Sequence, residues 1–473
     1  MRALLAFTGS RGDAQPGILL ARALRERGHD VTLALAPNLV AFARDHGVGA
    51  VPFGLDTGDL LEAQRTDHRF ASRDPRARLR ALFELQRRGV PEQLEDLRVL
   101  APGHDLVVAG MAGEEVAESV ARAHGLPFAA VHFFPIQPNS AVPVVPMRWA
   151  DRLPGFVHRW GWSVLARARA AALAPVLPTG HQPTRAVTAS SMTRSGTAPD
   201  AATTRIQAYD PRLFPGVRRE VPGPFTGFLT DVDGFLTGAP RSASYEPAVT
   251  SAGTRDHGAA LFPDSIDSPS TTGASDSLAR SATPPQPSAT PLESWLDTGT
   301  APIYVGFGSM DVGDPAAFVA MLREACARRG RRLLLASGWA TIDPEFDTAV
   351  AIVGQVDHAR VLPRCVAAVH HGGAGTTAAA LRAGVPQVIC SVQADQPYWG
   401  QALQRLGLAA TIPAERLTGA RLDALLDQVA QPDVVLRAAT YATNVATDGV
   451  ERAVDAIEAL VDTAEFQTAG RQL

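Results

Sequence analysis

The chain alternates short apolar runs with segments of helical pattern, and it does so twice, once in each half of its 473 residues. In the first half, the apolar runs Ala3–Phe7 and Val31–Ala36 stand on either side of a helix expected over Gly17–Arg27. The residues Gly9–Pro16 before this helix are expected to form a loop. Apolar runs without polar alternation are typical of strands buried on both faces, as in parallel sheets. The order strand, helix, strand therefore predicts a βαβ unit.

Further units of the same kind follow along the chain. Strands are expected at 106–109, 128–132, 303–307, 333–336, 352–353, 366–369 and 387–390, and helices over 114–124 and 315–328. Two such series in tandem predict an α/β protein with two doubly wound, Rossmann-like domains. In this architecture the loops at the carboxyl ends of the strands face each other across a cleft between the domains.

The two series are separated by a stretch of low complexity at about residues 238–291. It is rich in Ser, Thr, Ala, Pro and Asp and poor in large apolar residues. Such a composition cannot bury enough surface to offset the entropy of ordering, so we expect disorder or a loose surface loop. The predicted division is an N-terminal domain at 1–220, a linker at 221–237, the insert at 238–291, a C-terminal domain at 292–445 and a final helix or tail at 446–473.

Composition excludes several classes of function. The net charge of −4 leaves no electrostatic footprint for nucleic acid, and 46% apolar with 19% charged residues suits a globular protein with a large core. The apolar run Met1–Phe7 is too short for a signal peptide, and no run approaches the roughly 18 apolar residues of a membrane span. We therefore expect a cytoplasmic protein. Cys326, Cys365 and Cys390 lack metal-ligand spacing and are interpreted as core residues.

The most informative local motif is His-His-Gly-Gly-Ala-Gly-Thr-Thr at His370–Thr377. It follows the apolar run Cys365–Val369 and precedes Ala378–Leu381, which is expected to open a helix. A strand, a glycine turn and a helix start direct several free backbone N–H groups and a helix dipole at one place, which attracts a phosphate. Many glycine turns only reverse the chain, so the phosphate interpretation also depends on the downstream segments 386–388 and 395–399.

Three segments together resemble a known family. They are Gly-Ser-Arg-Gly-Asp-Ala-Gln-Pro at Gly9–Pro16, Arg-Gly-His-Asp-Val at Arg27–Val31, and the block His370–Trp399. In this order they resemble the GT-B nucleotide-sugar glycosyltransferases, above all the bacterial enzymes that glycosylate antibiotics and other natural products and the related sterol glucosyltransferases of the UDP-glycosyltransferase family. The resemblance covers nearly the whole chain except the insert. It implies that the N-terminal domain binds the acceptor and the C-terminal domain binds the nucleotide sugar.

The resemblance also implies roles for particular residues of the donor site. The diphosphate would be bound by His371, by the turn containing Gly372, Gly373 and Gly375, and by the hydroxyls of Thr376 and Thr377. The sugar hydroxyls would bind Asp395 and Gln396. The nucleotide would be lined by the loop Gly308–Met310, which contains Ser309, and by the segment Gln355–His358, with the backbone of Val356 near the base. Ser10 and Arg11 are either further diphosphate contacts or ordinary loop residues.

Two positions depart from the plant members of the wider family. Gln355 stands where the plant enzymes have a Trp under the base, and Ala379 stands where they have a ribose-binding Glu. Both changes resemble the bacterial branch. They leave the choice between a UDP-sugar and a dTDP-sugar open.

Glycosyl transfer passes through an oxocarbenium-like transition state, so the acceptor hydroxyl must lose a proton and the leaving diphosphate must be stabilised. Asp13 is the candidate base, because it follows the first strand at the end that faces the cleft. A carboxylate with a pKa near 4 is a weak base, but concerted transfer needs only a positioned acceptor. The alternative is that Asp13 caps the following helix.

No metal site is expected. Asp231-Val232-Asp233 has a suitable spacing but lies in the linker, and we interpret it as a solvated turn. A helix dipole, backbone donors and His371 would take the place of a metal at the diphosphate.

The acceptor side is less well defined by sequence. His132 and Phe133 end a predicted strand and are candidates for the acceptor pocket. The segment Met147–Leu177 holds Trp149, Phe156, Trp160 and Trp162 among several arginines. It has three interpretations: an aromatic lip over an apolar acceptor, an amphipathic helix on a membrane surface, or ordinary packing of a lid helix.

The resulting hypothesis is an inverting hexosyltransferase of secondary metabolism that uses a UDP- or dTDP-sugar and a small apolar acceptor, with no cofactor, no metal and no nucleic acid partner. Two alternatives remain. One is a GT-B nucleotide-sugar epimerase or hydrolase, which needs no acceptor, and the other is a non-catalytic auxiliary protein with this fold. The sequence leaves the oligomeric state open.

Overall fold

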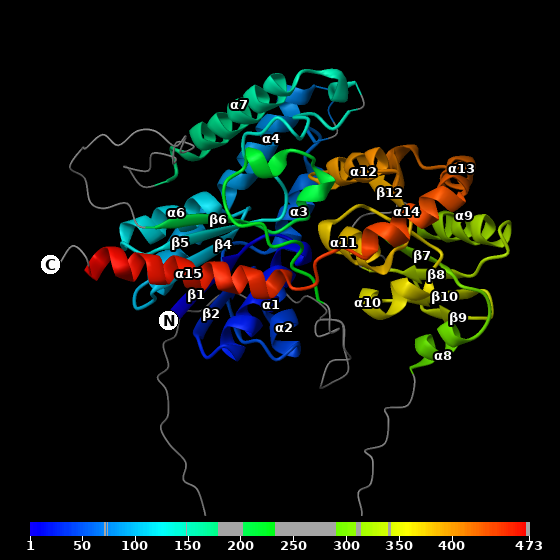
Figure 1. The fold of residues 1–473 in the computed structure, drawn as a ribbon, viewed down its shortest axis with the longest axis horizontal. Coiled ribbons are helices and arrows are strands. Elements are labelled where there is room, and N and C mark those ends of the chain that lie inside the picture. Colours follow the sequence, from blue (N-terminus) through cyan, green and yellow to red (C-terminus); the bar gives the residue numbers. More distant parts are fainter. Residues whose placement is uncertain are drawn as a thin grey trace, which may run out of the picture.

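The computed structural model describes residues 1–70, 72, 74–147, 149–177, 202–231, 290–308, 314–338 and 342–469. They form two α/β halves, each built on one twisted sheet with helices packed against it (Figure 1). This is the GT-B architecture that the sequence predicted.

The N-terminal half contains a six-stranded parallel sheet in the order β3-β2-β1-β4-β5-β6. Its strands are β1 (Arg2–Phe7), β2 (Asp30–Leu35), β3 (Ala50–Pro52), β4 (Leu106–Gly110), β5 (Phe128–His132) and β6 (Thr203–Gln207). Its helices are α1 (Arg11–Glu26), α2 (Pro37–Asp45), α3 (Thr57–Thr66), α4 (Pro75–Arg88), α5 (Val90–Leu100), α6 (Glu114–Ala123) and α7 (Gly155–Leu173).

The C-terminal half contains a seven-stranded sheet in the order β13-β12-β11-β7-β8-β10-β9, in which only β9 is antiparallel to its neighbour among the described strands. Its strands are β7 (Ile303–Gly306), β8 (Leu333–Ala336), β9 (Glu345–Phe346), β10 (Val350–Val353), β11 (Ala367–His370), β12 (Gln387–Ser391) and β13 (Ala409–Pro413). Its helices are α8 (Pro291–Asp297), α9 (Pro315–Ala327), α10 (His358–Val361), α11 (Ala374–Ala383), α12 (Gln396–Arg405), α13 (Gly419–Val429) and α14 (Pro432–Ala442), and α15 (Gly449–Ala469) ends the described chain.

The strands expected from apolar runs are present to within two residues. The strands that the sequence analysis missed are β3, β6, β9 and β13, and these are the edges of the two sheets. An edge strand is open on one side and need not be a continuous apolar run. For this reason the search for apolar runs identified the central strands and missed the edge strands.

The start of α1 corrects the expected loop at Gly9–Pro16. The helix begins at Arg11, six residues before the expected start, and it contains Pro16. Ser10 is the N-cap residue, and Asp13 at the third helical position accepts a hydrogen bond from its backbone N–H. This reciprocal capping pair starts the helix despite the nearby glycines and proline.

The glycine turn after β11 is also shorter than expected. Helix α11 begins at Ala374, so Gly375, Thr376 and Thr377 lie in its first turn and not in the loop. Gly372 has φ +90°, a left-handed conformation that favours glycine. Only three residues, His371 to Gly373, therefore separate the strand from the helix.

An aromatic cluster joins the two halves. Trp399 of α12 is fully buried, and its ring lies 5.6 Å from Phe134 and 5.4 Å from Phe214, both from the N-terminal half. The Tyr398 hydroxyl donates to the carbonyl of Val144 at 2.8 Å. Packing between aromatic side chains of this kind favours one defined arrangement of the two halves.

Helix α15 returns to the N-terminal half and packs on α1 (Figure 1). Ala453, Val454 and Ile457 are fully buried there in a common core cluster with the first strands. Glu458 accepts from Arg27 at 2.8 Å and lies 2.7 Å from His29 Nε2. Apolar packing and charged contacts therefore hold α15 against α1 and the residues that follow α1.

The expected insert needs one correction. Residues 238–289 lie outside the described residues, so the expectation of disorder stays a prediction. Thr290 and Pro291, which we placed in the insert, instead start α8: Thr290 is its N-cap, in a capping box with Glu293. Ser309, Val232 and Asp233 also lie outside the described residues.

Two other expectations can be compared with the structure. The three cysteines are buried and unpaired, which confirms them as core residues, and burial raises the pKa of each thiol to about 12. Across the described ranges, no helix is both long enough and apolar enough to cross a membrane. The cytoplasmic location stays a prediction.

Candidate active site

The first turn of α11 is open at its N-terminus. Its N-cap residue is Gly373, which offers no side-chain hydrogen bond, and the first turn holds no acidic residue. Gly375 is exposed, and Gly373 and Thr376 are half-buried. The first N–H groups of any helix lack intrahelical acceptors, and here neither a cap nor a carboxylate supplies one. This helix end can therefore accept an anion from outside the protein.

The two histidines before the turn have different surroundings. His370 is fully buried: its Nε2 lies 2.9 Å from Gln387 Oε1, and its Nδ1 accepts from the N–H of Gly372 at 3.1 Å. Burial lowers the pKa of His370 to about 3, so the ring is neutral and holds the shape of the turn. This agrees with the expectation that His370 is structural.

His371 lies at the rim of the turn. Its Nδ1 is buried and has no hydrogen-bond partner assigned among the described residues. Burial lowers the pKa of the imidazole, and the backbone of Gly306 acts against this shift. A Cβ on Gly373 would lie 2.5 Å from His371 Nε2, so glycine at this position makes room for the ring. Thr377, by contrast, is fully buried, and its hydroxyl has no partner within the described residues.

Tyr304 and His358 form a neighbouring polar pair, of which only His358 belongs to a segment that the sequence analysis assigned to the nucleotide. The Tyr304 hydroxyl lies 2.8 Å from His358 Nε2, and the two rings pack edge to face at 5.4 Å. Burial, with smaller contributions from Arg11 and His371, lowers the pKa of His358 to about 4. Tyr304 sits inside an apolar strand, where no sequence signal marks a functional residue.

The effect of Arg11 on His358 crosses between the two halves, because Arg11 opens α1 while His358 opens α10. The Arg11 guanidinium stacks on the ring of Phe42 at 4.4 Å from its centroid. Burial lowers its pKa, and no carboxylate of the described residues pairs with it. A half-buried guanidinium without a counter-ion is a receptor for an anion.

Asp13 faces the C-terminal half from the same turn. Its Oδ2 accepts from Ser10 N at 2.8 Å and from Ser10 Oγ at 3.1 Å. The alternative that Asp13 caps the helix therefore holds for this one oxygen of the carboxylate. Burial, with a further contribution from the charge of Asp395, raises the pKa of Asp13 to about 6. The value near 4 expected from sequence was therefore too low. Gly9, at φ +116°, allows this approach, since a Cβ there would collide with the carboxylate.

Asp395 ends the tight loop after β12 and is the N-cap residue of α12, and Gln396 is the first residue of that helix. Ala394 adopts φ +55°, which is strained for a residue with a side chain. Asp395 Oδ2 accepts from Trp399 Nε1 at 2.7 Å, and Gln396 Oε1 accepts from the N–H of Val392 at 2.8 Å. These bonds fix the loop against the aromatic cluster. Burial raises the pKa of Asp395.

Two family models match the chain. Residues 3–97 match the glycosyltransferase family 28 N-terminal domain, and residues 344–454 match the C-terminal domain of erythromycin biosynthesis protein CIII-like proteins. A glycosyltransferase of Mycobacterium bovis, described only as uncharacterised, is 33% identical over 448 residues, which cover 94% of each chain. The chain belongs to this glycosyltransferase family.

Other relatives and structural neighbours of this glycosyltransferase are enzymes of natural-product glycosylation. Vancomycin aglycone glucosyltransferase of Amycolatopsis orientalis is 27% identical over 469 residues, covering 95% of each chain. The structure of the glycosyltransferase VinC in complex with dTDP aligns with a TM-score of 0.55 and 20% identity over 98% of this chain and all of that one. The fold is thereby confirmed as GT-B, and the resemblance inferred from sequence is confirmed.

The nucleotide positions of this glycosyltransferase are only partly visible. Gln355 is exposed, whereas Val356 is buried. Asp357 caps α10, its Oδ1 accepting from the N–H of Ala359 at 2.9 Å. The exposed Gln355 side chain beside a buried, fixed backbone is compatible with a base lying over it. The assignment of Ser309 lies outside the described residues.

The two acceptor candidates are inside the N-terminal half of the glycosyltransferase. His132 is 1% exposed, with its Nε2 2.8 Å from Glu114 Oε2, and Phe133 is also buried. Burial works to raise the pKa of Glu114, but His132, Arg205 and Arg169 hold it at about 2. Neither candidate lies at an open surface, and their role with an acceptor stays a prediction.

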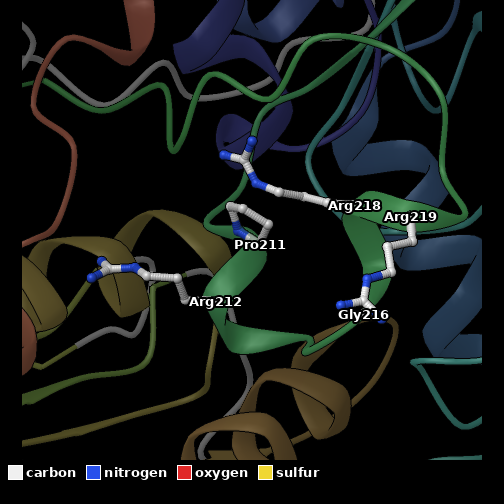
Figure 2. Close-up of a pocket in the computed structure, with 5 residues that line it drawn as sticks. All are labelled: Pro211, Arg212, Gly216, Arg218 and Arg219. Carbon is white, nitrogen blue, oxygen red and sulfur yellow. The ribbon is translucent and has the colours of Figure 1, made fainter.

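Figure 2 shows a small pocket away from these residues. It is lined by Pro211, Arg212, Gly216, Arg218 and Arg219. Its cations already contact the protein: Arg212 bonds to Asp210 at 3.0 Å and stacks on Tyr441, and Arg218 stacks on Phe225. We assign this pocket no chemistry.

Proposed function

We propose that the chain is an inverting, metal-independent hexosyltransferase that transfers a hexose from a UDP- or dTDP-sugar to a hydroxyl of a small apolar acceptor, a natural-product aglycone or a sterol-like lipid. One observation carries the proposal: charges act between the two halves, because Asp395 of the C-terminal half contributes to the raised pKa of Asp13, and Arg11 of the N-terminal half contributes to the lowered pKa of His358. A carboxylate and an unpaired cation of one half thus lie opposite the anion-accepting loops of the other.

In this reaction the acceptor oxygen attacks the anomeric carbon from the side opposite to the diphosphate. The bond from that carbon to the diphosphate oxygen breaks, and the hydroxyl proton passes to Asp13. The raised pKa of Asp13, about 6, makes it a better proton acceptor than an ordinary carboxylate. It is still largely ionised at neutral pH.

The departing diphosphate takes the negative charge. The first-turn N–H groups of α11, the dipole of that helix and the Arg11 guanidinium would stabilise this charge. His371, held at the rim by Gly373, would contribute a ring N–H. We propose that these groups perform the task that a metal ion performs in other nucleotide-sugar enzymes.

The relatives support the chemical class of both substrates. VinC was solved with dTDP, and the Amycolatopsis orientalis relative is named for an aglycone acceptor. We extend both to this chain as proposals, because the identities of 20% and 27% leave the donor and acceptor details free to differ.

The test is an assay of the purified protein with a panel of UDP- and dTDP-hexoses and apolar aglycones. We expect a glycoside whose anomeric configuration, read by proton NMR coupling constants, is opposite to that of the donor, with turnover unchanged by EDTA. Retention of configuration, or a loss in EDTA that Mg²⁺ restores, would contradict the mechanism.

A control without acceptor separates the alternatives. The donor should then remain intact, measured by chromatography over the same period. Formation of an epimer or of free hexose at the full rate would instead indicate an epimerase or hydrolase. Absence of any thermal shift with UDP, dTDP or their sugars would indicate an auxiliary protein.

A further inference from the structure

Helix α7 carries apolar side chains on two opposite faces. Its inner face is buried through Trp162, His158 and Leu173. Its outer face exposes Phe156, Trp160 and Val164, at 72%, 66% and 41% of their surfaces. The spacing of four residues places these three in one line along the helix. An outward aromatic line costs solubility and marks a contact surface.

The same surface is strongly cationic. Helix α4 packs against α7 on the outside of the N-terminal half (Figure 1). Together the two helices hold eight arginines and one acidic residue, Glu84, although the whole chain has a net charge of −4. Glu84 is itself paired with Arg69 at 2.6 Å, and two arginines of α7 pair with acids of other elements, Arg159 with Glu220 and Arg169 with Glu115. The arginines are Arg76, Arg78, Arg80, Arg87, Arg88, Arg159, Arg167 and Arg169.

Apolar and cationic groups alternate on this surface. On α7, Arg159 and Arg167 are exposed beside the aromatic line. On α4, Leu79 and Leu82 are exposed between arginines. Aromatic rings are favoured at the boundary between lipid and water, and arginine contacts the lipid phosphates there. Four to eight basic residues on such a helix are typical of binding to acidic lipids.

We propose that α4 and α7 form a docking surface for an anionic lipid bilayer, into whose interface Phe156 and Trp160 insert. Charge complementarity selects this occupant. A second copy of the chain would bring two surfaces together on which arginines outnumber acids, above all along α4, and this is repulsive. A bilayer with acidic headgroups matches both features, because its apolar interior can receive the aromatic side chains and its negative surface can bind the arginines.

The location of α7 gives this docking a use. The loop before it contacts α12 of the C-terminal half, where Arg405 pairs with Asp151 at 2.7 Å. The docking surface is therefore on the side of the molecule where the two halves meet. A lipid-like acceptor could then enter from the bilayer. This consequence depends on the proposed acceptor class, whereas the binding itself does not.

The test is flotation of the full chain with vesicles of phosphatidylcholine alone or with 30% phosphatidylglycerol. We expect binding to the anionic vesicles only, weakened by added salt, with a blue shift of tryptophan fluorescence. The double variant Phe156→Ser/Trp160→Ser should bind at least about tenfold more weakly, since its inserted apolar area is removed. The matched control is Val435→Ser/Leu436→Ser on α14, where Leu436 is 68% exposed, and it should bind as the parent does.

The charge is tested separately. Arg78→Gln/Arg80→Gln should weaken binding by tenfold or more, at about fivefold for each arginine near an acidic surface. Arg331→Gln/Arg416→Gln, which removes two exposed arginines of the C-terminal half, should not. Each variant is first compared with the parent by thermal melting, so that a folding defect is recognised.

Three results would overturn the proposal. They are absence of flotation with either vesicle, equal flotation with neutral and anionic vesicles, and equal losses in the test and control variants. Concentration-dependent dimers that disappear in Phe156→Ser/Trp160→Ser, without vesicle binding, would identify the surface as a contact between copies. The nucleotide thermal shift, measured on the same samples, reports the donor site independently.

Discussion

Helices α1 and α11 each begin directly after a buried strand and a glycine, but their first turns are used differently. In α1 the N-terminus is occupied by the protein itself: Ser10 is the cap, and Asp13 at the third position accepts its N–H. In α11 the cap is Gly373, and the corresponding third position is Thr376, with no acid in the turn. One helix end holds its own carboxylate, and the other is left for a ligand.

This difference assigns opposite tasks to two similar motifs. A helix N-terminus that carries its own anion does not need another, so α1 serves to position Asp13. A helix N-terminus without an anion binds one from solution, so α11 serves to bind the diphosphate. Arg11 belongs to the first motif but, because it lacks a carboxylate partner, is available to the ligand of the second.

The largest expected effect comes from removing the anion of α1. Asp13→Asn keeps an oxygen for the N–H of Ser10 but cannot take a proton, so turnover should fall about 100- to 10,000-fold. Affinity for UDP or dTDP should change little, as measured by calorimetry. If the variant retains more than a tenth of the parent turnover, Asp13 is not the base and serves only as a helix cap.

The next effect comes from making α11 resemble α1. Thr376→Asp places a carboxylate at the third position, where it should occupy the helix end and reduce nucleotide affinity by about 100-fold. The same charge should leave the melting temperature of the apo protein unchanged or slightly higher. Thr376→Asn, of the same size but neutral, is the control, with a loss of a few-fold. Equal losses in both variants would show that the helix end is not the anion site.

A smaller effect is expected for the cation shared by both motifs. Arg11→Gln removes the charge that His358 senses, and nucleotide affinity should fall about tenfold. The loss should shrink at high salt, which screens a half-exposed pair. Calorimetry at two ionic strengths measures this. If nucleotide affinity does not depend on Arg11, the only role left for this side chain is its stacking on Phe42.

The smallest effect concerns pH. With the pKa of Asp13 at about 6, kcat/KM should decline below that pH. Asp395→Asn removes the like charge and should move this limb to lower pH by less than about one unit. An unmoved limb would indicate that the two carboxylates do not interact.

The same shift has a consequence for stability. The folded protein holds the Asp13 proton more tightly than the unfolded chain does. Protonated Asp13 therefore adds to the free energy of unfolding, and this stabilisation is fully present below about pH 4 and is lost as pH rises through 6. From pH 4 to pH 7 the parent should therefore lose roughly 1–3 kcal/mol relative to Asp13→Asn. Paired thermal melts across that range measure it, and parallel curves would contradict the raised pKa.

Sequence alone determined the central strands, the two-domain plan, the buried cysteines and the glycine turn at His370–Thr377. These features depend on local apolar runs and on backbone chemistry within a few residues, which a single chain displays directly. The same reasoning missed the edge strands and placed the start of α1 too late, because Gly9, Gly12 and Pro16 suggested a loop where the Ser10–Asp13 pair starts a helix.

Only the tertiary structure decided the electrostatics of the site. The pKa of Asp13 depends on its burial and on Asp395, and that of His358 depends on its burial and on Arg11, each from the opposite half of the chain. Tyr304 became a polar neighbour only when β7 and α10 came together. Charge and desolvation act through space, so groups far apart in sequence fix each other's protonation only after the two halves have packed.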